Sequence, residues 1–270
     1  MAGDDGQRAG GAGGDIPRTR RQGGLRGAKP EVLVCADLAT AQAEAAERFV
    51  ATARAAIAAR GRFAVALAGG STPRGAYERL RTARLPWHAM HVFFGDERGV
   101  PPDHPDSNYR MAADALLLHV PIPAAQVHRM PADAADGDGA AAAYAAEVRA
   151  LLGPSPRFDL VMLGLGPEAH TASLFPGSAA LRERERWVVT YAVDPTHGRR
   201  MTMTPPLLSA ADLVMFLVAG ADKAGAVRRV LQGPADPDRY PAQAVTAPAV
   251  WILDRAAAGL DSGSPLTDKT

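Results

Sequence analysis

A carboxylate and a histidine follow directly on an apolar run that ends in two glycines. The apolar residues are 158–163, and the loop after them carries Gly164, Gly166, Glu168 and His170. Such a run predicts a buried parallel strand that leads into a tight loop, and open α/β sheets bind their ligands at this end of a strand. A histidine there can move protons near neutral pH. The spacing therefore predicts acid–base chemistry in which His170 activates a water molecule directly.

Other kinds of site fit this loop less well. Gly164, Gly166 and Ala169 match the loose dinucleotide pattern G-x-G-x-x-A, but Pro176 allows only a short helix where that pattern needs a long one. His170 lacks the carboxylate and histidine partners that a metal site needs at fixed helical spacing. The chain contains no G-x-S-x-G motif, which disfavours serine-hydrolase chemistry. The other histidines are expected to be structural or surface residues.

A second strand is followed by glycines, hydroxyl side chains and a helix. In the segment 66–75, Gly70 and its neighbouring glycine let the backbone approach an anion, and Ser71 and Thr72 are expected to cap the helix that Pro73 opens. The N-terminus of that helix would offer free N–H groups and a positive dipole to a phosphate. The alternative is an ordinary capped helix start without a ligand. A Walker loop is excluded because no Gly-Lys-Ser/Thr follows.

Charged residues follow a third strand. Asp96, Glu97 and Arg98 stand at a strand end, where polar groups meet substrate, and Asn108 could offer its amide to a sugar. Each of these residues also has a plainer interpretation. Glu97 could be a solvated loop charge, and Arg98 could pair with a neighbouring acid. Ser107 and Asn108 could serve only to cap a helix.

Two cations complete the set of candidate residues. Lys223 stands near the start of a predicted helix, where the dipole disfavours a cation, and an anion bound alongside would remove that conflict. Arg200 has the same two interpretations as Lys223. Each could hold an anion or simply extend into water.

Apolar runs alternate with helical stretches between residues 30 and 260. This alternation predicts an α/β fold, with a mostly parallel sheet covered by helices on both faces. The expected strands are 32–35, 63–68, 91–94, 159–163, 187–192, 213–218 and 250–253, and the expected helices are 38–59, 73–80, 108–118, 140–152 and 222–231. Residues 30–260 are expected to form a single catalytic domain.

Composition is typical of a cytoplasmic enzyme. The chain has 270 residues, 47% hydrophobic and 22% charged, which is enough for a large core. A net charge of +1 argues against nucleic acid or a membrane surface as the main partner, and no apolar run approaches transmembrane length. The single cysteine, Cys35, excludes an intramolecular disulfide and a multi-cysteine zinc site. Residues 1–29 and 261–270 are poor in large apolar side chains and are expected to be disordered.

Taken together, these loops resemble those of the 6-phosphogluconolactonases of the pentose phosphate pathway over about residues 32–260. The resemblance rests on AGGSTP at 68–73, GDER at 95–98 with DSNY at 106–109, GLG at 164–166 with HTASLFPG at 170–177, RMTMT at 200–204 and VAGADKA at 218–224. It implies a Rossmann-like, doubly wound fold that is shared with the glucosamine-6-phosphate deaminases. The implied reaction is hydrolysis of 6-phosphogluconolactone to 6-phosphogluconate without a metal or organic cofactor. The expected partner is this small sugar-phosphate lactone, and the expected state is a monomer or small homo-oligomer.

The candidate residues then take specific roles in our hypothesis. His170 is the acid and base, Glu168 steadies its imidazolium form, and Arg98 with loop N–H groups stabilises the oxyanion. The phosphate is held by Gly70, Ser71, Thr72, Arg200 and Lys223, while Asp96 and Asn108 bind sugar hydroxyls or orient Arg98. The family usually has Asp-Gly where this chain has Glu168 and Ala169. Because alanine takes a positive φ less freely than glycine, a reshaped loop is expected there.

Two other functions are compatible with parts of the sequence. A glucosamine-6-phosphate deaminase or isomerase would share the phosphate loop, but residues 171–176 and the position of Arg98 favour the lactonase. A non-catalytic sugar-phosphate sensor would need a DNA-binding helical domain, for which the N-terminal extension is too short and too rich in glycine.

Overall fold

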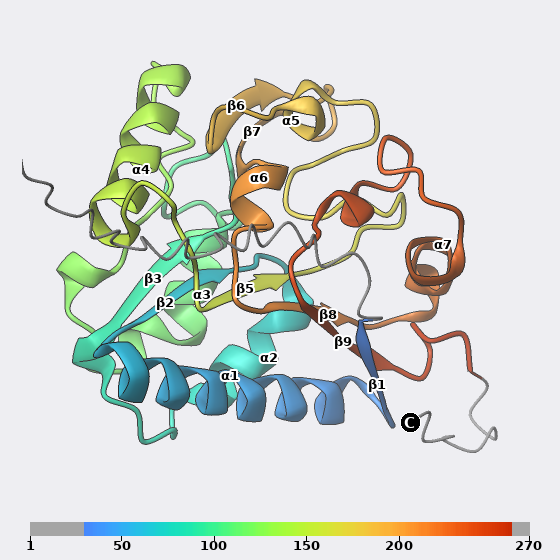
Figure 1. Ribbon diagram of the computed structural model, residues 1–270, viewed down its shortest axis with the longest axis horizontal. Coiled ribbons are helices and arrows are strands. Elements are labelled where there is room, and N and C mark those ends of the chain that lie inside the picture. The colour runs from blue at the N-terminus through green and yellow to red at the C-terminus, as the bar shows by residue number, and fades with distance from the viewer. Residues whose placement is uncertain (1–29, 261–270) are drawn as a thin grey trace, which may run out of the picture.

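A parallel sheet surrounded by helices forms the body of the protein, whose computed structural model describes residues 30–260 (Figure 1). The strands of this sheet lie in the order β1-β9-β8-β5-β2-β3, and every neighbouring pair is parallel. They are β1 (Glu31–Cys35), β2 (Phe63–Leu67), β3 (Met90–Phe94), β5 (Leu160–Leu163), β8 (Val214–Val218) and β9 (Ala249–Asp254). The predicted α/β class is confirmed. The predictions for residues 1–29 and 261–270 lie outside the described residues.

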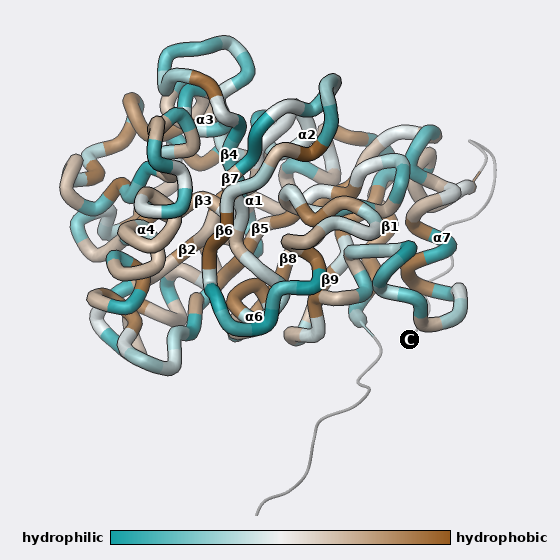
Figure 2. The backbone as a smooth tube through the Cα atoms, turned by 90° about the horizontal axis from the view of Figure 1, so that it is seen from above, coloured by the Kyte–Doolittle hydropathy of each residue, from teal (hydrophilic) through white to brown (hydrophobic). Residues whose placement is uncertain are grey.

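The central strands are apolar throughout because helices cover both faces of the sheet. Every residue of β2, β5 and β8 is buried, as is typical of strands in a doubly covered parallel sheet. In Figure 1, α1 (Leu38–Arg60) and α2 (Ser71–Leu80) lie below the sheet, and α4 (Gly137–Leu152) and α6 (Pro205–Leu208) lie above it. Figure 2 shows the most hydrophobic stretches along the strands, with hydrophilic loops around them.

Polar side chains fix where several helices begin. Asp37 accepts a hydrogen bond from the Thr40 N–H at the start of α1, and Asp136 does the same for Gly139 in α4. Because Asp136 is the cap, α4 starts three residues before the expected position 140. The remaining helices are α3 (Asn108–Ala115), α5 (Ala179–Arg182) and α7 (Ala224–Gln232), with single 3₁₀ turns at 87–89, 117–119, 124–126, 221–223 and 241–244. Within residues 30–260, no helix has the length and apolar composition needed to cross a bilayer.

A second, antiparallel sheet lies beside the main one and was missed in part by the sequence analysis. Its strands lie in the order β4 (Asp96–Arg98), β7 (Arg199–Met203) and β6 (Val188–Ala192). The expected strand at 187–192 is therefore real, but it belongs to this small sheet rather than to the parallel one. Strands β4 and β7 begin with charged residues and carry little apolar alternation. That alternation is the pattern that identifies a half-buried strand.

A buried carboxylate joins two central strands at the amino edge of the main sheet. Asp159 is only 4% exposed and precedes β5. One of its carboxylate oxygens accepts a hydrogen bond of 2.6 Å from the N–H of Ala64 in β2, and the other pairs with Arg60 at the end of α1. Without Asp159, the N–H of Ala64 would stay buried without this acceptor.

Replacing this carboxylate should weaken the fold. We expect Asp159→Ala to lower the free energy of unfolding by about 1–3 kcal/mol, the usual cost of an unsatisfied buried donor. The matched control is Arg157→Ala, because Arg157 is 71% exposed and pairs with Asp212 at the surface. That variant should stay within about 0.5 kcal/mol of the parent. Urea unfolding followed by circular dichroism measures both, and equal losses would contradict the role of Asp159.

Candidate active site

A cleft of about 510 Å³ lies where β2, β3, β5 and β8 end. This is the edge at which open parallel sheets bind ligands. Its lining includes most of the residues predicted from the sequence, namely Gly70, Ser71, Thr72, Asp96, Arg98, Asn108, His170 and Lys223. Among the described residues, Glu168 and Arg200 do not belong to this lining. Glu168 instead contacts His170, and Arg200 lies opposite Arg98 in the small sheet.

The imidazole of His170 is held in one orientation. Its Nδ1 lies 3.0 Å from Oε2 of Glu168, and its ring stacks on Phe175 with the ring centroids 4.2 Å apart. Gly166 lies directly against the ring, because a Cβ there would come within 2.0 Å of His170 Cε1. Among residues 30–260, the second ring nitrogen, Nε2, has no hydrogen-bond partner in a side chain that lines the cleft.

The charges of this pair are set by their surroundings. Burial lowers the pKa of His170, and the hydrogen bond and negative charge of Glu168 offset this only in part. A backbone hydrogen bond and the hydrogen bond with His170 lower the pKa of Glu168. Near neutral pH the pair is therefore a neutral imidazole beside a carboxylate. Because Nδ1 faces Glu168, the basic nitrogen is Nε2.

The turn that carries His170 has a strained residue. The N–H of Gly166 donates to the carbonyl of His170 at 2.8 Å, and the N–H of Ala169 donates to the carbonyl of Gly166 at 2.9 Å. Ala169 has a φ of 62°, in the left-handed region that costs an L-residue roughly 1–2 kcal/mol. Alanine thus adopts a backbone that favours glycine, so the reshaped loop expected from the sequence is not needed for Glu168 to reach His170.

The start of α2 differs in one respect from the prediction. Ser71 and Thr72 are not caps, because the N-cap is Gly70, with a φ of 95° and no side-chain hydrogen bond. The helix therefore begins at Ser71, and its first N–H groups have no acceptor within the helix. Gln42 of α1, which the sequence analysis did not single out, donates to the carbonyl of Thr72 at 2.9 Å and fixes the backbone there. An uncapped helix N-terminus facing a cleft is a favourable place for an anion.

Lys223 approaches the same cleft from the end of β8. Its Nζ lies 3.0 Å from Oδ2 of Asp222, and its side chain is 22% exposed. The 3₁₀ turn that contains it leads directly into α7, so the cation does stand near a helix start as predicted. Lys223 and the free N–H groups of α2 are the positive partners that the cleft offers at this place.

A polar network connects the small sheet to the histidine loop. Asn108 Nδ2 donates to the carbonyl of Asp96 at 2.8 Å, and Oδ2 of Asp96 accepts from Ser173 Oγ at 2.6 Å. Asn108 also packs against Gly69, where a Cβ would come within 1.7 Å of its Oδ1. Ser107, not Asn108, caps α3. Ser173 belongs to the histidine motif, but the sequence predicts no role for it, because its partner Asp96 is distant along the chain.

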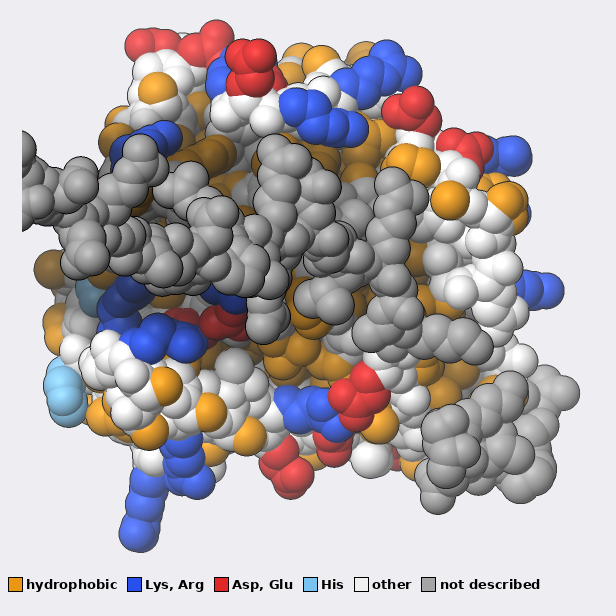
Figure 3. Space-filling model, viewed as in Figure 1, with side chains coloured by type: hydrophobic (Ala, Val, Ile, Leu, Met, Phe, Trp, Pro, Cys, Tyr) orange, Lys and Arg blue, Asp and Glu red, His pale blue; other side chains and the backbone are white. Residues whose placement is uncertain are grey.

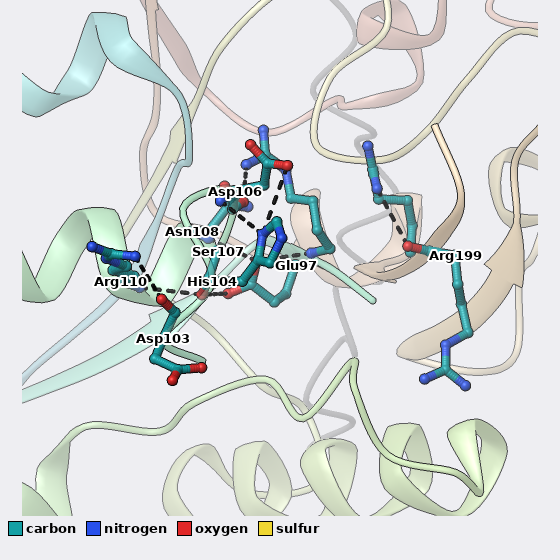
Figure 4. A network of polar contacts seen from close by, with 10 residues as sticks. Glu97, Asp103, His104, Asp106, Ser107, Asn108, Arg110 and Arg199 are labelled. Carbon is teal, nitrogen blue, oxygen red and sulfur yellow. Dashed lines mark hydrogen bonds and ion pairs between the residues drawn. The ribbon is translucent and has the colours of Figure 1, made fainter. Parts of the chain in front are cut away.

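Glu97 is not the solvated loop charge that the sequence also allowed. Glu97 is 2% exposed rather than solvated, and burial raises the pKa of its carboxyl while backbone N–H donors oppose this. Figure 4 shows Glu97 beside Ser107 and Asn108.

Arg98 pairs with no acid among the described residues, and its guanidinium donates to the carbonyl of Asp106. Burial and the nearby charge of Arg98 lower the pKa of Arg200. Neither of these two neighbouring arginines pairs with an acid within residues 30–260, an arrangement that favours an anionic ligand.

Two further features of the described residues concern metal-ligating side chains and surface charge. Within residues 30–260, no group of three or more His, Cys, Asp or Glu side chains is arranged to hold a metal ion. On the described atoms of the face in Figure 3, basic and acidic side chains are interspersed.

The strain at Ala169 can be measured. Ala169→Gly should leave the free energy of unfolding unchanged or raise it, because relief of the left-handed φ offsets the greater freedom of glycine in the unfolded chain. The matched control is Ala112→Gly, because Ala112 is equally buried but lies inside α3. The control should lose about 1 kcal/mol. Chemical denaturation compares the two, and an equal loss at both sites would show that Ala169 is not strained.

Comparison with known proteins places the chain in a family. Residues 36–252 match the family model described as Glucosamine-6-phosphate isomerases/6-phosphogluconolactonase. The chain is 45% identical to the 6-phosphogluconolactonase of Synechocystis sp. over 208 residues, which cover 75% of this chain and 86% of that protein. It is 40% identical to the 6-phosphogluconolactonase of Mycobacterium tuberculosis over 228 residues, which cover 80% and 92%. The 6-phosphogluconolactonase from Trypanosoma cruzi has a similar structure, with a TM-score of 0.76 at 31% identity, covering 86% of this chain and 96% of that one. The chain therefore belongs to the glucosamine-6-phosphate isomerase/6-phosphogluconolactonase family.

Proposed function

We propose that this protein is a 6-phosphogluconolactonase, which hydrolyses 6-phosphoglucono-1,5-lactone to 6-phosphogluconate in the oxidative pentose phosphate pathway. One observation carries the proposal beyond the names of its relatives. One cleft is lined by a histidine that a carboxylate orients and also by an uncapped helix N-terminus and a lysine. The first arrangement suits proton transfer at an ester, and the second suits a phosphate.

In this mechanism His170 acts first as a base. Glu168 accepts the hydrogen bond from Nδ1–H, which leaves the lone pair of Nε2 to take a proton from water. The water attacks the lactone carbonyl, and the imidazolium then returns its proton to the departing ring oxygen. Glu168 stabilises the imidazolium between these two steps. Proton transfer of this kind contributes about 10²–10⁴-fold to the rate.

The developing oxyanion needs donors that are already in place. Arg98 lines the cleft and has no acid partner among the described residues, so its charge is available to the tetrahedral intermediate. Backbone N–H groups of the glycine-rich loop after β5 would add to it. Arg200 lies opposite Arg98 on the neighbouring strand β7, where it increases the local positive potential that an anionic substrate meets.

The phosphate would bind at the far end of the same sugar. The backbone at Gly70, the N–H and hydroxyl groups of Ser71 and Thr72, and the ammonium of Lys223 form its site in this proposal. Asp96 and Asn108 would accept and donate hydrogen bonds to ring hydroxyls. Binding energy gained at the phosphate is remote from the scissile bond, so it serves to position the carbonyl for attack.

The histidine provides the direct test. We expect His170→Ala to lower kcat by about 10²–10⁴-fold with a smaller change in KM, because the phosphate contacts are untouched. His119→Ala, at an exposed position outside the cleft lining, is the matched control and should keep the parent's kcat. The assay follows acid production from freshly generated lactone, corrected for spontaneous opening. Unchanged kcat in His170→Ala would reject the role.

The carboxylate partner predicts a shift in pH dependence. Neutral His170 is the reactive form, so kcat/KM should fall as the pH drops through a pKa below the ordinary value of about 6.5. Ionised Glu168 raises that pKa, so Glu168→Gln should move the midpoint to lower pH. The plateau should also fall, because the imidazolium loses its partner. A midpoint that moves to higher pH would contradict this arrangement.

The main alternative lies within the same family, whose description also includes glucosamine-6-phosphate isomerases. Release of ammonia from glucosamine 6-phosphate, without acid production from the lactone, would decide for that alternative. Binding of sugar phosphates without turnover of either compound would indicate a non-catalytic sensor. A cytoplasmic location, a single catalytic domain and a monomeric or small homo-oligomeric state stay predictions from the sequence.

A further inference from the structure

Glu97 is a buried carboxylate that no step of the proposed reaction uses. Its side chain lies between β4, to which it belongs, and the start of α3. Its Oε1 accepts hydrogen bonds from the N–H groups of Arg98 at 2.8 Å and Asn108 at 2.7 Å. Its Oε2 accepts from the N–H of Tyr109 at 2.8 Å and from Ser107 Oγ at 3.0 Å. Four donors from two segments therefore meet on one side chain.

The two segments that Glu97 joins each bring a side chain into the cleft. Arg98 enters from β4, and Asn108 enters from the first position of α3. Both have their own backbone N–H bound to the same oxygen of Glu97. The guanidinium of Arg98 also reaches back to the carbonyl of Asp106 on the loop before α3. A change at Glu97 would therefore move both cleft residues relative to the rest of the site.

Only a carboxylate satisfies this set of partners. All four partners donate, and each oxygen of Glu97 accepts at least one backbone N–H. An amide in its place would turn an NH₂ group toward a backbone N–H whichever way it is flipped. The negative charge also lies at the N-terminus of α3, where the helix dipole favours it.

We propose that Glu97 is a positioning residue, which holds Arg98 at the reacting carbonyl by tying β4 to the start of α3. This inference rests on the proposed lactone hydrolysis and on the role of Arg98 in it. Glu97 touches no substrate itself, because its oxygens are fully occupied by protein donors.

A double-mutant cycle in kcat tests the proposal. Glu97→Gln should lower kcat for the lactone by about 10–100-fold, the loss that follows when a charged group is misplaced by about 1 Å. The double variant Glu97→Gln with Arg98→Ala should stay within about threefold of Arg98→Ala alone in kcat, because Glu97 acts on kcat through Arg98. Displacement of Asn108, which binds ring hydroxyls in this proposal, should appear in KM instead. Losses that multiply in the double variant, or a parental kcat in Glu97→Gln, would overturn it. Where Glu97→Gln does not fold, Glu97→Asp decides by the same cycle, because it keeps the charge but is one methylene too short to reach both segments.

Two controls separate positioning from loss of stability and from failure of the function itself. Asp159→Ala weakens the fold at the opposite edge of the sheet and should keep the parent's kcat per folded molecule. A similar fall of kcat in this control would show that Glu97 acts through stability alone. His170→Ala is assayed alongside. If it keeps full activity, the proposed function fails, whereas an inactive His170→Ala beside a fully active Glu97→Gln rejects only the positioning role.

Discussion

The common direction of the central strands is the constraint on which this site depends. Strands β2, β5 and β8 are parallel neighbours in one sheet, so the segments that follow them leave at the same edge. Those segments carry the start of α2, the His170 loop and Lys223. Residues more than a hundred positions apart in the chain thereby line one cleft. A doubly covered sheet also buries these strands completely, which gives the site a rigid base.

Burial and the charge of Glu168 act in opposite directions on the pKa of His170, and burial has the larger effect. Burial alone favours the neutral imidazole, and the Glu168 carboxylate favours the imidazolium. A strained alanine at 169 holds the turn that brings the two together. Arg98 and Arg200 lie side by side without acid partners among the described residues, an arrangement that an anionic substrate would relieve.

The small antiparallel sheet gives the site a second support. Its β4 strand places Asp96, Glu97 and Arg98 with alternating directions, as any strand must. Asp96 reaches the histidine loop through Ser173, and Glu97 reaches α3 through four hydrogen bonds. Charged residues here are therefore divided between holding the backbone and facing the cleft. This division resembles other active sites, in which the residues that touch substrate are oriented by partners behind them.

The sequence by itself determined the parallel sheet, the edge that carries the site and most of the cleft residues, because buried strands and glycine-rich loops leave strong local patterns. It did not determine that Gly70 rather than Ser71 or Thr72 is the N-cap of α2, that 187–192 joins a separate sheet with β4 and β7, or that Glu97 is buried. Short polar strands carry no periodic signal. The partners of Glu97 at the start of α3 and the partner of Ser173 on β4 lie 10 or more residues away along the chain. Only the tertiary structure brings such partners together, and so only it decides which charges support the site and which face the ligand.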